Sequence, residues 1–184
     1  MLTHRFKCIV TALFLAVGFS LPAAADDGRL DELYQNLLEA DEDSYLRIEG
    51  QIMAQWERSG SPAMDLLLRR GKDALEDGEP EVAAEHFGAL VDHAPEFAEG
   101  YYGRASSYYQ LGLIGPALDD IETTLRLNPR HFEAMRGLAN IMQELERSED
   151  ARELYELILT INPQSAESQA ALDFLNTQLE GQAL

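Results

Sequence analysis

A regular spacing of prolines is the feature that most constrains the fold of this chain. Pro95, Pro129 and Pro163 are separated by 34 residues each (129 − 95 and 163 − 129), and each follows an apolar run with helical periodicity. A fixed period of this size is typical of stacked supersecondary units, which bury their apolar faces against one another. The spacing therefore predicts an array of repeats rather than one globular core.

The segment 104–129 shows the layout of one such unit, with two amphipathic helices joined by a turn that contains Gly112 and Pro116. Superposing the units on their prolines aligns a small residue in each first helix, and a small residue followed four places later by a large one in each second helix. These residues are Gly71, Ala105 and Ala139, and then Ala83–Phe87, Ala117–Ile121 and Ala151–Tyr155. A small residue lets two helix axes approach closely, and the large residue one turn later fills the space beside it.

This small–large–proline pattern resembles the tetratricopeptide repeat (TPR), a helix-turn-helix unit of the same period. The resemblance covers about residues 63–163, in three copies that are in phase. It departs from the family at Leu90 and Ile158, where a small residue is preferred, and at Glu146, which replaces a turn glycine. The resemblance implies an all-α fold, an α-solenoid built from three helix-turn-helix units.

The flanks of the repeats complete the predicted organisation. An N-terminal helical hairpin is expected over 26–60, because two apolar stripes with helical spacing lie there. A capping helix and tail are expected over 166–184, because the open end of a repeat array would expose its core. The three repeats between them are expected at about 64–97, 98–131 and 132–165.

The first 25 residues have the layout of a secretory signal peptide. A basic start at Arg5 and Lys7 precedes an apolar run over 8–19, and Ala23-Ala24-Ala25 offers a cleavage site. A retained membrane anchor is the other interpretation, but a run of about a dozen residues is shorter than the roughly 20 that span a bilayer. The pattern predicts export to the periplasm, with secretion as the alternative and no membrane contact after cleavage.

The acidity of the chain restricts the partners that it can have. The net charge is −19, and removing residues 1–25 takes away two of the 14 basic residues and no acid, giving −21 (12 − 33). Nucleic acid is excluded as a partner because phosphate binding needs clustered Lys and Arg. The charge either serves solubility or favours a basic partner. The only cysteine, Cys8, lies in the predicted signal peptide, so the mature fold must rest on packing without disulfides.

The sequence contains no arrangement of residues that is typical of catalysis. We find no phosphate-binding loop, no nucleophile elbow and no zinc-protease motif. His86 and His93 lie seven residues apart on one expected helix, which places them about 10 Å apart along its axis, too far for one metal ion. His131, at the turn after Pro129, offers less still. We therefore expect no enzyme activity, no cofactor and no metal.

The resemblance implies a concave wall formed mainly by the first helix of each repeat. Besides Leu68, Glu76 and Glu99, the non-core positions on those helices are the candidate partner-binding residues: Lys72, Tyr102, Ser106, Tyr109, Gln110, Arg136, Asn140 and Gln143. Tyr102 and Tyr109 offer flat apolar area with a polar tip, which suits the binding of an extended peptide or a helix. In the alternative interpretation, one tyrosine packs between repeats and the other is merely exposed.

One group of TPR proteins clamps the terminal carboxylate of a chaperone peptide with Lys, Asn and Arg side chains. The corresponding positions here hold Leu68, Lys72, Gly103, Glu133 and Gly137. Only Lys72 is basic, and Glu133 would repel a carboxylate. The resemblance therefore does not extend to that clamp.

These observations predict a non-enzymatic periplasmic TPR adaptor that binds a protein or peptide in its groove. The alternative is an accessory subunit of a cell-envelope assembly or cofactor-maturation complex, held through the helices of 26–59. Self-association through exposed repeat ends, and a hydrolase that uses unrecognised carboxylates, are further alternatives.

Overall fold

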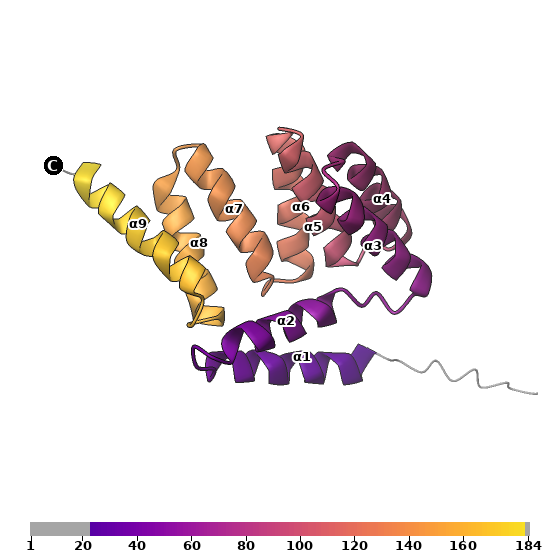
Figure 1. The fold of residues 1–184 in the computed structure, drawn as a ribbon, viewed down its shortest axis with the longest axis horizontal. Coiled ribbons are helices and arrows are strands. Elements are labelled where there is room, and N and C mark those ends of the chain that lie inside the picture. Colours follow the sequence, from indigo (N-terminus) through magenta and orange to yellow (C-terminus); the bar gives the residue numbers. More distant parts are fainter. Residues whose placement is uncertain (1–22, 183–184) are drawn as a thin grey trace, which may run out of the picture.

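The computed structural model describes residues 23–182, and this range is all-helical (Figure 1). Within it the helices are α1 (Ala23–Leu38), α2 (Tyr45–Trp56), α3 (Pro62–Glu76), α4 (Pro80–His93), α5 (Ala98–Gln110), α6 (Ile114–Leu127), α7 (Phe132–Glu144), α8 (Ser148–Ile161) and α9 (Ala166–Gln182). The predicted all-α solenoid is confirmed over this range. Most of the predicted signal peptide, residues 1–22, lies outside the described residues. None of the described helices is long and apolar enough to cross a membrane.

The helices from α3 to α8 form three hairpins that follow one another along the chain. The partners α3–α4, α5–α6 and α7–α8 pack closely, and each hairpin also contacts the next, with α9 packed on α8. In Figure 1 these helices form a curved row, and α1 and α2 lie together along one edge of it. The row is the solenoid, and the edge occupied by α1 and α2 is where the candidate site lies.

The turn inside each hairpin has the same backbone geometry in all three repeats. Gly78 and Gly112 have φ angles of 75° and 72°, and Glu146, at the equivalent position, has a φ of 59°. The residue that follows this position donates its N–H to the carbonyl five residues earlier, at 2.8 Å in each repeat. The donors are Glu79, Leu113 and Arg147. This is a Schellman turn, which needs a left-handed residue. Glu146 therefore keeps the turn, at a cost of about 1 kcal/mol that glycine would not have.

The small and large residues that the repeats share are buried where neighbouring helices touch. Ala83, Ala117 and Phe87 are completely buried. The Phe87 ring fills the space left by two glycines: a Cβ atom added at Gly71 would lie 2.6 Å from the ring, and one added at Gly103 would lie 2.3 Å from it. The absence of both side chains lets α3 and α5 close around one aromatic ring.

The apolar side of the N-terminal hairpin is buried inside this chain. Leu37, Ile52 and Trp56 belong to the same core cluster as Phe132 and Tyr155 of the third repeat, while the first repeat has a separate cluster around Phe87, Leu90 and Leu68. The hairpin is thus part of the main core, although it precedes all the repeats in sequence.

Three contacts fix α1 against the loop between α6 and α7. The Tyr34 hydroxyl donates to the Arg130 carbonyl at 3.1 Å. The Arg130 guanidinium lies 3.9 Å from the centre of the Tyr34 ring and pairs with Asp31 at 2.6 Å. The cation–π contact adds to the hydrogen bond, so the hairpin docks through polar as well as apolar contacts.

Candidate functional site

His131, for which the sequence indicated no role, lies where the N-terminal hairpin contacts the repeats. It is fully buried at the N-cap of α7, where its Nδ1 accepts a hydrogen bond from the Ala134 N–H at 3.1 Å. A ring that accepts at Nδ1 carries its proton on Nε2, which donates to Glu99 Oε1 at 2.8 Å. Trp56 stacks on the ring at 4.3 Å between centroids, and Tyr102 packs on it at 4.7 Å. One imidazole therefore joins α2, α5 and α7.

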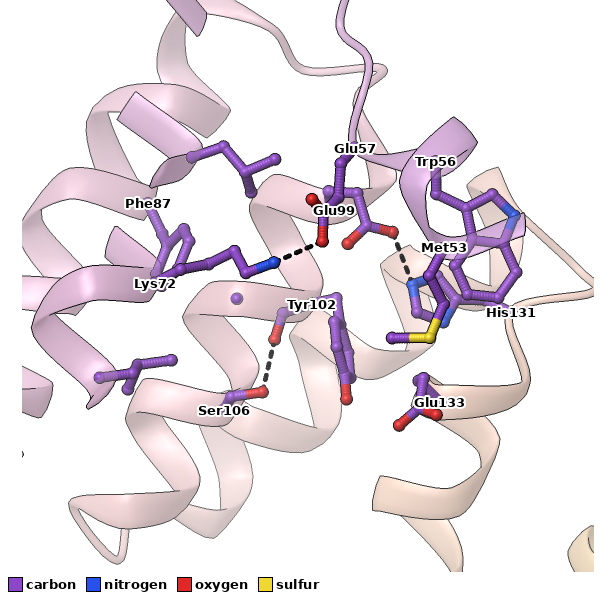
Figure 2. Close-up of a pocket in the computed structure, with 13 residues that line it drawn as sticks. Met53, Trp56, Glu57, Lys72, Phe87, Glu99, Tyr102, Ser106, His131 and Glu133 are labelled. Atoms are coloured by element: carbon purple, nitrogen blue, oxygen red, sulfur yellow. Dashed lines mark hydrogen bonds and ion pairs between the residues drawn. The ribbon is translucent and has the colours of Figure 1, made fainter. Parts of the chain in front are cut away.

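A cavity of about 180 Å³ lies beside this imidazole, between α2 and the inner faces of α3 and α5 (Figure 2). Its apolar walls come from four helices and include Met53 and Trp56 of α2, Leu68 of α3, Phe87 of α4 and Tyr102 of α5. Because α2 forms one wall, the site exists only when the N-terminal hairpin is docked on the repeats.

Polar groups surround these apolar walls. Lys72 extends to Glu57 and forms an ion pair with it (Figure 2). The Ser106 hydroxyl donates to the Tyr102 carbonyl one turn earlier, at 3.0 Å, so its hydrogen-bond acceptor lies within α5. Glu133 also lines the cavity. The arrangement is an apolar pocket with charged groups around it, which is the usual composition of a binding pocket.

Three of the eight sequence-predicted residues line this pocket: Lys72, Tyr102 and Ser106. The first is exposed, and the other two are partly buried. Burial raises the pKa of the Tyr102 hydroxyl, and the negative charges of Glu133 and Glu99 add to the effect. Tyr102 therefore keeps its proton and offers the pocket a ring face.

The other residues predicted on α5 and α7 lie elsewhere. Tyr109 and Gln110 are exposed near the end of α5, and the Tyr109 hydroxyl hydrogen bonds to the Glu144 carboxylate, which raises the pKa of the tyrosine. Asn140 Oδ1 accepts from the Tyr155 hydroxyl at 2.9 Å. Gln143 Nε2 donates to that same hydroxyl at 3.3 Å. The structure thus uses the two amides to hold α8 against α7.

Arg136 is engaged by carboxylates from three helices. Its guanidinium lies 2.8 Å from Glu133 in its own helix, 3.2 Å from Glu167 of α9 and 3.6 Å from Glu49 of α2. Burial raises the pKa of Glu49 although Arg136 is close, and the charges of Glu133 and Glu167 act in the same direction. One guanidinium therefore does not compensate the three carboxylates, and the cluster is short of positive charge.

The sequence did not predict the pocket residues Met53 and Trp56 of α2, nor Glu57, which follows the end of that helix. The periodicity of 45–56 shows an apolar stripe that must be covered, and its only tryptophan lies at the end of the helix. Nothing in the spacing shows which repeat covers it. Among the described residues, no group of three or more His, Cys, Asp and Glu side chains is placed to hold a metal ion.

Comparison with known proteins identifies the family. The model of the tetratricopeptide repeat matches residues 68–120 and 116–166, which together span more than half of the chain. The chain belongs to the tetratricopeptide repeat family. Members of this family are generally non-catalytic scaffolds. A TPR repeat-containing protein of Rhizobium etli is 29% identical over 154 residues, which cover 83% of this chain and 76% of the relative.

Two solved structures show the same TPR fold. The first TPR of Spaghetti (RPAP3), bound to the HSP90 peptide SRMEEVD, has a TM-score of 0.60 at 22% identity and covers 64% of this chain and 93% of its own. The MamA crystal structure has a TM-score of 0.59 at 21% identity and covers 82% of this chain and 84% of its own. At these identities the likeness shows the fold.

Proposed function

We propose that this protein is a non-enzymatic adaptor that is exported to the periplasm and binds a protein or peptide on the inner face of its repeats. The observation that carries this proposal is the apolar pocket beside Tyr102, which is formed before any partner arrives. TPR domains of known structure bind peptides, as the RPAP3 domain does with its HSP90 peptide. Export is proposed from the sequence pattern of residues 1–25 alone.

The N-terminal hairpin narrows the part of the inner face that a partner can reach. Trp56 covers His131, and Glu49 reaches Arg136, so α2 covers the part of the face that these two residues form. Lys72 and Ser106 lie on the side of α2 that faces the first repeat. We infer that the partner binds over α3 and α5.

This partner differs in chemistry from the acidic HSP90 peptide of the RPAP3 complex. Glu99 and Glu133 both line the pocket, and Lys72 is already paired with Glu57. An acidic chain end would bring further negative charge to carboxylates that have few cations near them, which is unfavourable. A neutral or basic segment suits the same face.

Crosslinking in the native cell, followed by identification of the captured protein, tests the proposal. We expect the wild type to capture a specific partner and the Ser106→Phe variant, whose new ring fills the pocket, to lose it. Asn176→Phe is the matched control, because it adds the same ring at an exposed position of α9 that does not line the pocket. Equal capture by all three proteins would remove the pocket from the function.

Cell fractionation tests the location separately. Expressed from its full-length sequence, the protein should be released with the periplasmic contents in a processed form that begins near Asp26. Recovery with the cytoplasmic contents, at full length, would refute export and leave the binding proposal standing.

The accessory-subunit alternative receives less support from the structure. It needs the 26–59 helices to contact another subunit, but Leu37 and Ile52 are completely buried in this chain. Size-exclusion chromatography of native extract distinguishes the two functions, since an accessory subunit elutes in a stable large complex and an adaptor elutes mainly alone.

A further inference from the structure

We propose that the pocket beside α2 accepts one aromatic or large aliphatic side chain of the partner, flanked in the partner by lysine or arginine. This inference rests on the proposed function and names the chemistry that the inner face recognises. Its two parts, the apolar anchor and the flanking cation, come from different observations and are tested separately.

The size of the pocket supports the apolar anchor. Its volume is about 180 Å³, and apolar cavities of roughly 150 Å³ are known to hold one benzene molecule. One phenyl, indole or leucine side chain therefore fits, and a second would not. The walls suit this use, because the Phe87 ring is held between two glycines, whereas the Met53 thioether can adapt to the shape of the guest.

The arrangement of the side chains around the pocket also supports an apolar anchor. Met53 of α2 and Tyr102 of α5 project into the same space from opposite helices (Figure 2). Tyr102 is fixed by its packing on His131, so its ring does not have to be ordered when a guest arrives. A guest side chain inserted there would contact a preformed surface, which lowers the entropic cost of binding.

The surrounding charge supports the flanking cation. Three carboxylates line the pocket, Glu57, Glu99 and Glu133, and Lys72 is paired with the first of them. His131 donates to the second and adds no permanent charge. The third shares the single Arg136 with the carboxylates of Glu49 and Glu167, so acids outnumber permanent cations around the face by five to two. A partner cation would correct this excess, and a partner carboxylate would increase it.

The single tryptophan makes the test direct. Trp56 is the only tryptophan of the chain and lines the pocket, so its fluorescence reports occupancy. We would titrate the purified protein with the capped pentapeptide Gly-Lys-Phe-Lys-Gly and with two matched peptides, one with Ala in place of Phe and one with Glu in place of both Lys. The first should bind at least about tenfold more tightly than the Ala peptide, since burying a phenyl ring is worth more than about 1.4 kcal/mol. It should also bind more tightly than the Glu peptide, since the three carboxylates that line the pocket repel further negative charge.

Variants identify the surface that binds the peptide. Ser106→Phe should abolish the fluorescence change, and Asn176→Phe, at an exposed position outside the pocket, should leave the affinity unchanged. Glu133→Gln should weaken binding of the lysine peptide several-fold, and should reduce the dependence of its affinity on salt concentration. Unfolding of a variant would be seen by circular dichroism. The titrations of the wild-type protein with the three peptides test the inference without any variant.

The possible failures are distinguishable from those of the proposed function. Equal affinity for the Phe and Ala peptides, or tighter binding of the Glu peptide, overturns this inference even if crosslinking recovers a native partner. The expected peptide ranking without any partner in the cell supports the pocket chemistry and overturns the adaptor role.

Discussion

Replacing Gly103 by alanine tests whether the Phe87 ring, rather than helix propensity, determines which residue this position accepts. A Cβ atom at Gly103 would lie 2.3, 2.5 and 2.6 Å from three atoms of the ring. The ring is completely buried, and Gly71 lies close to it as well, so it has little room to move. The same substitution one repeat later, at Gly137, meets only an Ile121 methyl at 4.0 Å.

The expected change in the free energy of unfolding follows from two opposing effects. Replacing glycine by alanine inside a helix stabilises it by about 1 kcal/mol. Overpacking a filled core costs about 1–3 kcal/mol. Gly137→Ala should therefore raise the free energy of unfolding by up to about 1 kcal/mol. Gly103→Ala should fall below Gly137→Ala by about 1–3 kcal/mol, since the propensity gain is shared and cancels in the comparison.

Urea unfolding followed by far-UV circular dichroism measures both variants, and each kcal/mol should also move the melting temperature by about 2–4 °C. A third protein, with Phe87→Leu added to Gly103→Ala, removes part of the obstruction. In that background the alanine should cost less than it does beside Phe87. Equal stability of the Gly103 and Gly137 variants, within error, would refute the packing explanation.

Three further predictions concern other contacts. Glu146→Gly should stabilise the protein by about 0.5–1 kcal/mol in thermal melts, because the glutamate has a positive φ of 59°. Tyr34→Phe should cost about 1 kcal/mol at neutral pH through loss of the hydrogen bond to the Arg130 carbonyl. Since burial raises the pKa of Tyr34 from 10.0 to about 12, its contribution is complete below pH 10 and is lost as the pH rises to 12. Urea midpoints measured across that range should therefore fall more for the wild type than for the phenylalanine variant. Arg104→Ala should cost about 3 kcal/mol in urea unfolding, because it removes two 2.8 Å hydrogen bonds from the buried Asp120 carboxylate, and adding Asp120→Asn should recover part of that loss.

The repeat architecture could be predicted because its determinants are local. The proline spacing and the pairs such as Ala83–Phe87 lie within a few turns of one another. The Schellman turn at Glu146 also follows from its position in the repeat, even though the glycine is missing. Each of these features depends only on the packing of one helix against the next. Such local packing leaves a repeated pattern in the sequence.

The pocket could be predicted only in part because it depends on contacts across the whole chain. The pattern of its own helix predicts that Arg136 is an unpaired cation in the groove. In the structure it pairs with Glu49 and Glu167, which lie on helices before and after the repeats in sequence. The sequence around His131 predicts an ordinary turn residue. Its contact with the N-terminal hairpin is seen only in the structure, where Trp56 stacks on its ring. Helical periodicity shows that the hairpin has an apolar face, but it carries no information on where that face docks.

The hydrogen bond from the Tyr34 hydroxyl to the Arg130 carbonyl spans 96 residues and has a consequence for the order of folding. During synthesis the N-terminal hairpin leaves the ribosome first, but its docking surface is complete only when the third repeat has followed. Until then the side of the hairpin that carries Leu37 and Ile52 lacks the part of its core that the third repeat supplies, and it is exposed to aggregation or to chaperones. Arrays with contacts between neighbours alone can fray from either end, whereas here the first helices lock onto the last repeat, so both ends should melt together.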